Sequence, residues 1–253
     1  MKKNTNFKCY AFIPARSGSK RVKDKNIKKL GKHPLMAYSI VAALESNIFD
    51  KVICSTDDIE YAEIAKYYGA EVPFLRSQKI AKDNSSDIEW VKELLEFINN
   101  QQVDCDVFSI LRPTSPFRSK YTIQKAYNLF LKEMPDSLRA VELCSQHPGK
   151  MWQIQSNRML PLLPFSKNNV PWHSSQYASL PAVFVQNASL EIAWSKTVMM
   201  KDSISGSDIM PFYTEELEGF DINNNEDWIL AEHYISQNPQ LLNTINIKPY
   251  SKK

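Results

Sequence analysis

The sequence predicts a Rossmann-like α/β fold, in which a mostly parallel sheet carries helices on both faces. Three observations lead to this prediction. Strand-like and helix-like patterns alternate through the first half of the chain. A stretch rich in proline and aromatic residues, at about 146–181, then interrupts the pattern, and strand and helix patterns return before the C-terminus. Because crossovers between parallel strands are right-handed, the alternation favours a doubly covered sheet.

The first half is predicted to contain five strands rich in apolar or β-branched residues, at 7–13, 51–55, 71–75, 107–111 and 137–143. The helices between them are predicted at about 34–46, from a cap at Asp57 or Asp58 to Tyr68, from a cap at Ser85 or Ser86 through Ile98, and at about 121–131. Strands are also expected at 183–186 and near 219–222, and a closing helix at about 225–236.

The interrupting stretch contains five of the 14 prolines, interleaved with aromatic side chains such as Trp152 and Trp172. It is too apolar for a solvated linker, so we expect an arm that is buried against the domain or against a second subunit. The sequence therefore predicts a single domain over 1–253 with an arm inserted at about 146–181.

Composition excludes several classes of protein. Hydrophobic residues make up 43% and charged residues 23%, which excludes a mainly disordered chain. The net charge of +3 is too weak to indicate nucleic acid, and no apolar run reaches the roughly 18 residues of a membrane span. The first apolar stretch is too short for a secretion signal, so we expect a cytoplasmic protein with free thiols. The four histidines lack metal-ligand spacing, which makes a built-in transition-metal site unexpected.

Ligands of open parallel sheets bind beyond the carboxyl ends of the strands. The segment 14–26, after the first strand, holds Gly18 between two serines and five cations, namely Arg16, Lys20, Arg21, Lys23 and Lys25. Small residues let backbone N–H groups approach an anion, and the cations neutralise it. A polyphosphate is therefore the expected ligand. The segment is neither a Walker loop nor a GxGxxG fingerprint. A solvated basic turn, or a patch for nucleic-acid phosphates, is the alternative.

Other strand ends are polar as well. Asp57 follows the second strand, where it is either a site residue or a helix cap. Arg76 and the segment 81–86 follow the third strand. This region either recognises the base of a nucleotide or starts a helix. Arg112 and Arg118 flank a proline-rich turn, where bidentate arginine suits a carboxylate or phosphate, although solvated arginines on a surface turn are the rival interpretation.

Asp221 and Asn223 are two positions apart in the predicted strand near 219–222, so their side chains are expected on one side of it. Two oxygen donors there suit Mg²⁺ beside a triphosphate. An ordinary polar strand face is the alternative.

Together these motifs resemble the acylneuraminate cytidylyltransferases, or CMP-sialic acid synthetases, a family that includes enzymes for related bacterial nonulosonic acids. The resemblance runs from about Cys9 to the closing helix. It is carried by the segments 13–20, 25–26, 55–57, 81–86 and 113–116, with Gln176, Asn187-Ala188 and Asp221-Ile222.

The resemblance implies that the anomeric hydroxyl of a 2-keto sugar acid attacks the α-phosphorus of CTP, with Mg²⁺ assistance, and releases pyrophosphate. The nucleotide site is expected at Arg16, Ser17, Gly18, Ser19, Lys20, Asn26, Arg76, Ala81, Asp83 and Ser85. The acceptor site is expected at Arg112, Thr114, Ser115, Gln176 and Asn187. The expected catalytic residues are Arg16, Lys25 and Asp221, and the expected metal ligands are Asp221 and Asn223. The family's dimers exchange an arm, which implies a homodimer here.

Three positions depart from the family. It usually has glutamine at the position of Arg112, aspartate at that of Asn223, and arginine at that of Ser175. We hypothesise that Arg112 pairs with the carboxylate of the acceptor, and that this acceptor differs from ordinary N-acetylneuraminate. Because asparagine supplies only a neutral oxygen, we also expect a high Mg²⁺ requirement.

Other functions remain open from the sequence. The same fold and phosphate segment serve a nucleotidyltransferase for another sugar or a sugar 1-phosphate. Asn223 also fits a nucleotide-sugar-binding protein that has lost turnover. A nucleic-acid binder that uses the cations of 20–29 is disfavoured by the modest net charge.

Overall fold

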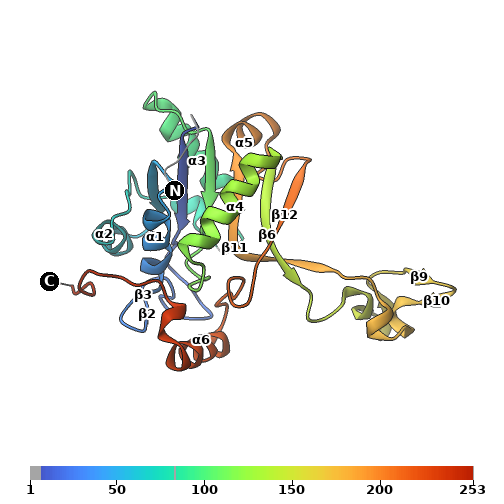
Figure 1. Ribbon diagram of the computed structural model, residues 1–253. Helices are drawn as coiled ribbons and strands as arrows, with labels where there is room; N and C mark the ends of the chain where they lie inside the picture. The colour runs from blue at the N-terminus through green and yellow to red at the C-terminus, as the bar shows by residue number, and fades with distance from the viewer. Residues whose placement is uncertain (1–6, 83, 253) are drawn as a thin grey trace. The chain divides into compact units, whose positions relative to one another are not determined.

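A computed structural model describes residues 7–82 and 84–252 of the chain (Figure 1). The described residues form two compact units. The first consists of residues 7–82, 84–140 and 187–252, and the second is Val141–Gln186, which contains the predicted arm. Asp83, which the sequence assigns to the nucleotide site, lies outside the described residues.

The first unit contains a six-stranded sheet in the order β12-β6-β11-β5-β1-β4. Its strands are β1 Cys9–Pro14, β4 Lys51–Ser55, β5 Val107–Ile110, β6 Ser137–Leu143, β11 Phe184–Trp194 and β12 Ile209–Tyr213. Strand β1 pairs in parallel with both β4 and β5, whereas β11 runs antiparallel to β5. The predicted α/β fold is confirmed, and the carboxyl ends of β4, β1 and β5 lie at one edge of the sheet.

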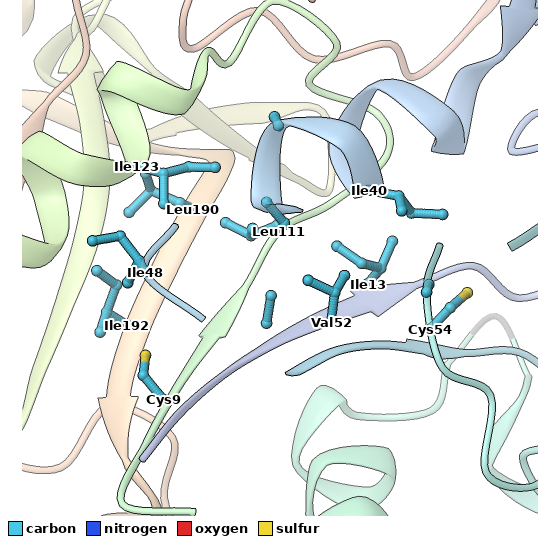
Figure 2. Packing of buried hydrophobic residues seen from close by; sticks show 14 of the residues in the cluster. Cys9, Ile13, Ile40, Ile48, Val52, Cys54, Leu111, Ile123, Leu190 and Ile192 are labelled. Carbon is cyan, nitrogen blue, oxygen red and sulfur yellow. The ribbon is translucent and has the colours of Figure 1, made fainter. Parts of the chain in front are cut away.

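Alternation along β1 separates two helical layers. Cys9, Ala11 and Ile13 pack in one core cluster with residues of α1 Leu35–Glu45, α2 Ile59–Tyr67 and α4 Lys120–Glu133. Tyr10 and Phe12 pack in another with α3 Asp87–Asn100 and α5 Ser195–Lys201. Figure 2 shows the first of these clusters, where Ile13 lies near Ile40 of α1 and Val52 of β4, and Cys9 lies nearer Ile192 of β11. Period-two alternation therefore covers both faces of the sheet.

A third cluster joins the C-terminal segment to this framework. It contains Leu30 of β2 Lys29–Leu30, which pairs with β3 His33–Pro34, and Trp228 of α6 Asn225–Gln237. Beyond α6 and η5 Pro239–Leu241, the chain continues along the first unit. The backbone N–H of Tyr250 donates to Tyr68 Oη at 3.1 Å, so the described end of the chain is packed rather than loose.

Three predicted elements in the later and middle parts differ from the structure. The expected strand at 71–75 is reduced to one bridge between Glu71 and Ile53, because the chain turns away towards η1 Gln78–Ile80. The expected strand near 219–222 is a turn followed by irregular backbone. The strand expected at 183–186 extends to Trp194 as β11, and α5 and β12 follow it without having been predicted.

The second unit consists of short elements. Its ribbons are β7 Trp152–Gln155 with β8 Arg158–Pro161, and β9 Ser166–Lys167 with β10 Val170–Pro171. Its single-turn helices are η2 Pro148–Lys150, η3 Trp172–Ser174 and η4 Tyr177–Ser179. Of the described residues in this unit, only His147 and Gly149 are buried. Many apolar side chains here are therefore exposed, including Ile154, Met159 and Phe165.

None of the helices in the described part of the chain is both long enough and apolar enough to cross a membrane.

Candidate active site

A pocket of about 270 Å³ lies beyond the carboxyl ends of β1, β4 and β5, where the sequence places the chemistry. Its lining comprises Pro14, Arg16, Ser19, Lys25, Asn26, Arg76, Ile80, Lys82, Ser85, Asp87, Trp90, Arg112, Pro113 and Thr114. A second hollow of about 300 Å³ shares Arg16, Ser19 and Lys25 with it and adds Lys20, Arg21, Val22 and Asn223. The residues 14–26, here called the phosphate loop, therefore contribute to both spaces.

The phosphate loop is held in place by Asp57. Its carboxylate accepts the backbone N–H of Ser17 at 2.7 Å and the Ser17 hydroxyl at 2.8 Å. Asp58 is the cap of α2, so the two aspartates have separate roles. Gly18 adopts a φ of +72°, which glycine adopts without strain. Because Ser17 is bonded to Asp57, its contribution is to fix the loop.

Lys25 links the phosphate loop to the distant segment around Ile222. Its Nζ donates to the Ile222 carbonyl at 2.7 Å, and the Ile222 N–H donates to the Thr114 carbonyl at 2.9 Å. Burial lowers the pKa of the Lys25 ammonium, although the Asp221 carboxylate opposes that shift. Lys25 is thus a partly buried cation with a main-chain partner, positioned at both spaces.

Asp221 and Asn223 do lie together, although no strand aligns them. Asn223 Nδ2 donates to Asp221 Oδ2 at 2.8 Å. Asp221 Oδ1 is buried and has no hydrogen-bond partner among the described residues. A buried carboxylate oxygen normally accepts a hydrogen bond. An oxygen that accepts none is therefore suited to bind a cation. No cluster of three or more His, Cys, Asp or Glu within 7–82 and 84–252 is arranged to hold a metal ion.

The donor set fits Mg²⁺ better than a transition metal. Mg²⁺ is usually bound through one or two carboxylates and completes its shell with water and phosphate oxygens. Asp221 supplies one carboxylate, and the side-chain oxygen of Asn223 is the neighbouring neutral donor.

Another part of the pocket lining, here called the arginine wall, consists of Arg76, Asp87, Trp90 and Arg112. Arg76 is 5% exposed and donates to Ser55 Oγ at 2.9 Å and to the Ser55 carbonyl at 3.0 Å. Its guanidinium lies 4.9 Å from the centre of the Trp90 ring. Burial lowers the pKa of Arg76 to about 10, with Asp57 opposing the shift.

The two arginines after β5 differ from each other. Arg112 lines the pocket, with its guanidinium bound to Asp87 and Glu191. Arg118 is neither solvated nor in the pocket: it is 1% exposed and donates to the carbonyls of Arg112 and Ser189 and to Ser39 Oγ. Burial lowers the pKa of Arg118 to about 9, and the charge of Arg112 adds to this shift.

Several predicted residues lie outside the pocket lining. Ala81 and Ser115 are buried. Asn187 Nδ2 donates to Thr214 Oγ1 at 2.8 Å, and its Oδ1 accepts the Ser189 N–H. Gln176 belongs to the second unit, where it contributes to a separate pocket of about 430 Å³ together with Trp172 and Lys167.

Asp87 and Trp90 were not predicted as site residues. Asp87 directly follows the α3 cap and Trp90 is at an apolar helix position, so both had an ordinary structural explanation in the sequence.

Residues 10–184 match the family described as Cytidylyltransferase. The chain belongs to this family. It is therefore a nucleotidyltransferase, as the sequence motifs predicted.

Two curated relatives and one solved structure are similar to the chain. It is 34% identical to the CMP-N,N'-diacetyllegionaminic acid synthase of Legionella pneumophila, over 92% of this chain and 98% of the relative. It is 39% identical to the pseudaminic acid cytidylyltransferase of Campylobacter jejuni, over 51% of this chain and 56% of the relative. A solved structure of CMP:2-keto-3-deoxy-manno-octonic acid synthetase complexed with CTP matches 91% of this chain and 99% of that one, with 14% identity and a TM-score of 0.66. This likeness agrees with the fold.

Proposed function

We propose that the protein transfers the cytidylyl group of CTP to the anomeric hydroxyl of a sialic-acid-like 2-keto sugar acid, a nonulosonic acid. The names of its relatives, which make activated legionaminic and pseudaminic acids, support this acceptor class. The observation that carries the proposal is the meeting of Lys25, the Ile222 segment and the buried Asp221 oxygen beside the phosphate loop. Cations for a triphosphate and a donor for its metal are thereby provided at one site.

In the proposed reaction, the acceptor hydroxyl oxygen forms a bond to the α-phosphorus, and the bond from that phosphorus to the bridging oxygen breaks. Pyrophosphate leaves with the electron pair, and the proton of the acceptor hydroxyl is released to water. Arg16 and Lys25 neutralise the charge that builds up on the phosphate oxygens, while the backbone of the phosphate loop orients them. Asp57 keeps the loop in position throughout. Chemistry of this kind depends mainly on positioning and on electrostatic stabilisation.

We assign Mg²⁺ to Asp221 and Asn223. When bound, the ion supplies Lewis-acid stabilisation of phosphate charge. Asp221 contributes the only carboxylate of this pair, so the pair provides a single negative charge to the ion. Ser19 and Asn26 line the pocket from the phosphate loop, and Ser85 lines it from the start of α3.

We also propose a homodimer that uses the second unit. Its exposed apolar side chains include Ile154, 66% exposed, and Met159, 57% exposed. A second copy of the chain would remove this surface from water. The predicted cytoplasmic location is supported by the four cysteines, all within the described residues, forming no disulfide, since disulfides are rare in reducing compartments.

The first experiment incubates the protein with CTP, Mg²⁺ and a panel of nonulosonic acids, and measures pyrophosphate and the mass of the product. We expect a CMP-sugar with one or two acceptors, and unmodified N-acetylneuraminate is not expected to be preferred. Sugar 1-phosphates, and ATP, GTP and UTP in place of CTP, are the controls. Product from a sugar 1-phosphate, or tight CTP binding without any pyrophosphate, would contradict the proposal.

The metal assignment has its own test in Asn223→Asp. An added carboxylate should lower the Mg²⁺ concentration for half-maximal rate by about three-fold or more, because ligand charge strengthens a cation site. Asp221→Asn should raise that concentration, and the pair of titrations shows whether both side chains belong to the site. Identical Mg²⁺ titrations for wild type and Asn223→Asp would remove Asn223 from the metal shell.

A further inference from the structure

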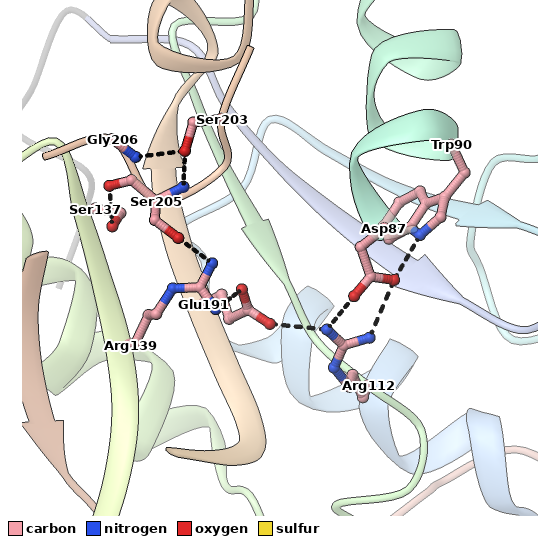
Figure 3. Close-up of polar contacts among 9 residues, drawn as sticks. All are labelled: Asp87, Trp90, Arg112, Ser137, Arg139, Glu191, Ser203, Ser205 and Gly206. Carbon is pink, nitrogen blue, oxygen red and sulfur yellow. Dashed lines mark hydrogen bonds and ion pairs between the residues drawn. The ribbon is translucent and has the colours of Figure 1, made fainter. Parts of the chain in front are cut away.

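Arg112 lies between two carboxylates at the arginine wall. Its Nη2 is 2.7 Å from Asp87 Oδ2 and 2.8 Å from Glu191 Oε1, and its Nη1 is 3.5 Å from Asp87 Oδ1. Figure 3 shows the guanidinium bridging Asp87, at the first residue of α3, and Glu191 on β11. Arg112 itself follows β5, so three separate elements meet at this one side chain.

The ion pairs continue beyond Glu191. Its Oε2 is 2.8 Å from Arg139 Nη1, and Arg139 Nη2 donates to Ser205 Oγ at 2.7 Å (Figure 3). Two carboxylates and two guanidinium groups thus alternate from α3 across β5 and β11 to β6. Their formal charges cancel, so the network is neutral as a whole. Glu191 is 5% exposed, and such a buried carboxylate needs its partners.

This arrangement leaves Arg112 poorly suited to receive a ligand carboxylate. A guanidinium binds carboxylates through its planar fork, and here the fork already contacts two protein carboxylates. Burial alone would lower the pKa of Arg112, but Asp87 and Glu191 outweigh it and the pKa lies above its usual range. A ligand would have to displace a protein carboxylate in order to use this charge.

We propose that Arg112 is a positioning residue of the nucleotide pocket: it neutralises Asp87 and fixes the start of α3, and the carboxylate of the acceptor binds elsewhere. The proposal rests on the proposed function for the identity of the nucleotide and deepens it.

A chain of contacts connects Arg112 to the rest of the arginine wall. Asp87 Oδ1 accepts a hydrogen bond from the indole N–H of Trp90 at 2.8 Å. The Arg76 guanidinium in turn lies over the Trp90 ring. Asp87, Trp90 and Arg76 all line the pocket. Loss of the Arg112 charge would therefore leave an unbalanced carboxylate facing an anionic nucleotide and would loosen the support of Trp90.

The backbone at Arg112 is anchored without its side chain. The Arg112 carbonyl accepts from Ser39 Oγ at 3.1 Å and from the two Nη atoms of Arg118 at 3.4 and 3.3 Å. Glu191 retains its ion pair with Arg139 if Arg112 is substituted. Substitutions at Arg112 are therefore expected to leave the fold in place, and thermal unfolding of each variant checks this.

The test is CTP binding measured by calorimetry without acceptor, for wild type, Arg112→Gln, Asp87→Asn and the double variant. Arg112→Gln should weaken CTP binding by about ten-fold, because Asp87 then repels the nucleotide. Adding Asp87→Asn should restore affinity to within about three-fold of wild type, because it removes that charge and keeps an acceptor for Trp90. Arg112→Lys, which keeps the charge but not the fork, should lie between. Lys132→Gln, which removes an exposed cation of α4, is the control and should leave CTP binding unchanged.

Steady-state kinetics separates the two roles of Arg112. An unchanged CTP affinity in Arg112→Gln together with a raised KM for the acceptor, not rescued by Asp87→Asn, would overturn the proposal and assign Arg112 to the acceptor. So would a double variant that binds CTP more weakly than Arg112→Gln. If wild type forms no CMP-sugar, the proposed function fails while the binding comparison still stands. If another nucleotide binds in place of CTP, the same ratios are measured with it.

Discussion

The phosphate loop and the arginine wall line the same pocket but hold their cations differently. Lys25 donates to a main-chain carbonyl, and within residues 7–82 and 84–252 no carboxylate forms an ion pair with it, although the charge of Asp221 acts on it. Arg76 and Arg112 are instead bound by protein groups: Ser55 and the Trp90 ring hold one, and two carboxylates hold the other. The comparison indicates that the phosphate loop provides positive charge to a bound ligand, whereas the arginine wall determines the shape of the pocket.

The largest expected effect is on the loop side. Lys25→Met should lower kcat/KM for CTP by about 100-fold or more, because it removes a preorganised cation from the phosphate site. Lys29→Met, which removes an exposed lysine of β2, is the matched control and should leave kcat/KM within about two-fold of wild type. A loss below about five-fold for Lys25→Met would break the comparison, since the loop would then not be the source of charge.

A smaller effect is expected from the anchor of the loop. Asp57→Ala removes both bonds to Ser17 and should raise KM for CTP by about ten-fold, although it also removes a negative charge near the phosphates. Asp57→Asn keeps an acceptor for the Ser17 N–H and should retain most of the affinity. If Asp57→Ala bound CTP more tightly than wild type, charge repulsion rather than positioning would be the main role of Asp57.

On the wall side, Arg76→Lys keeps the charge and loses the planar fork to Ser55 and the stacking on Trp90. We expect a loss of about 1–2 kcal/mol in the free energy of unfolding, with KM for CTP raised only a few-fold. Urea unfolding and steady-state kinetics measure the two quantities. A large rise in KM with unchanged stability would show that this arginine supplies charge to the ligand as the loop does.

The smallest effect is a pH dependence at the wall. Burial would raise the pKa of Asp87, but Arg112 and the Trp90 N–H outweigh it, so the pKa lies below its ordinary value. The folded protein therefore binds fewer protons here than the unfolded chain. The contribution of Asp87 to the stability of the folded protein is complete above pH about 4. It is lost as the pH falls through the lower pKa that Asp87 has in the folded state.

Asp87→Asn should accordingly flatten the acid limb of the stability curve, measured by urea unfolding between about pH 2 and 5. The difference should stay below about 1 kcal/mol, because the Asp87 side chain is 40% exposed and solvent screens the pair. Superimposable curves for wild type and Asp87→Asn would show that the ion pair contributes nothing to folding.

The sequence predicts local features well and long-range partners poorly. Helices with caps, such as the one that begins after Ser86, and strands in apolar runs, such as 51–55, lie where periodicity places them. Strand β11 is longer than predicted, because Asn187 and Glu191 are polar and yet buried. Their partners, Thr214 and Arg112, come from elsewhere in the chain. The pairing of Arg112 depends on Glu191, 79 positions away, which no local pattern encodes.

The hydrogen bond between Lys25 and Ile222 affects when the pocket can form during synthesis of the chain. The two residues are 197 positions apart, and Ile222 also joins Thr114, so the pocket is completed by a segment that is synthesised 197 residues after Lys25. Contacts of such separation form late, after shorter loops have closed. A polypeptide that stops before Ile222 keeps every residue of the phosphate loop and yet has no carbonyl to receive Lys25. Chains that stop before Ile222 are thus expected not to bind nucleotide, so nucleotide binding reports that translation has passed Ile222.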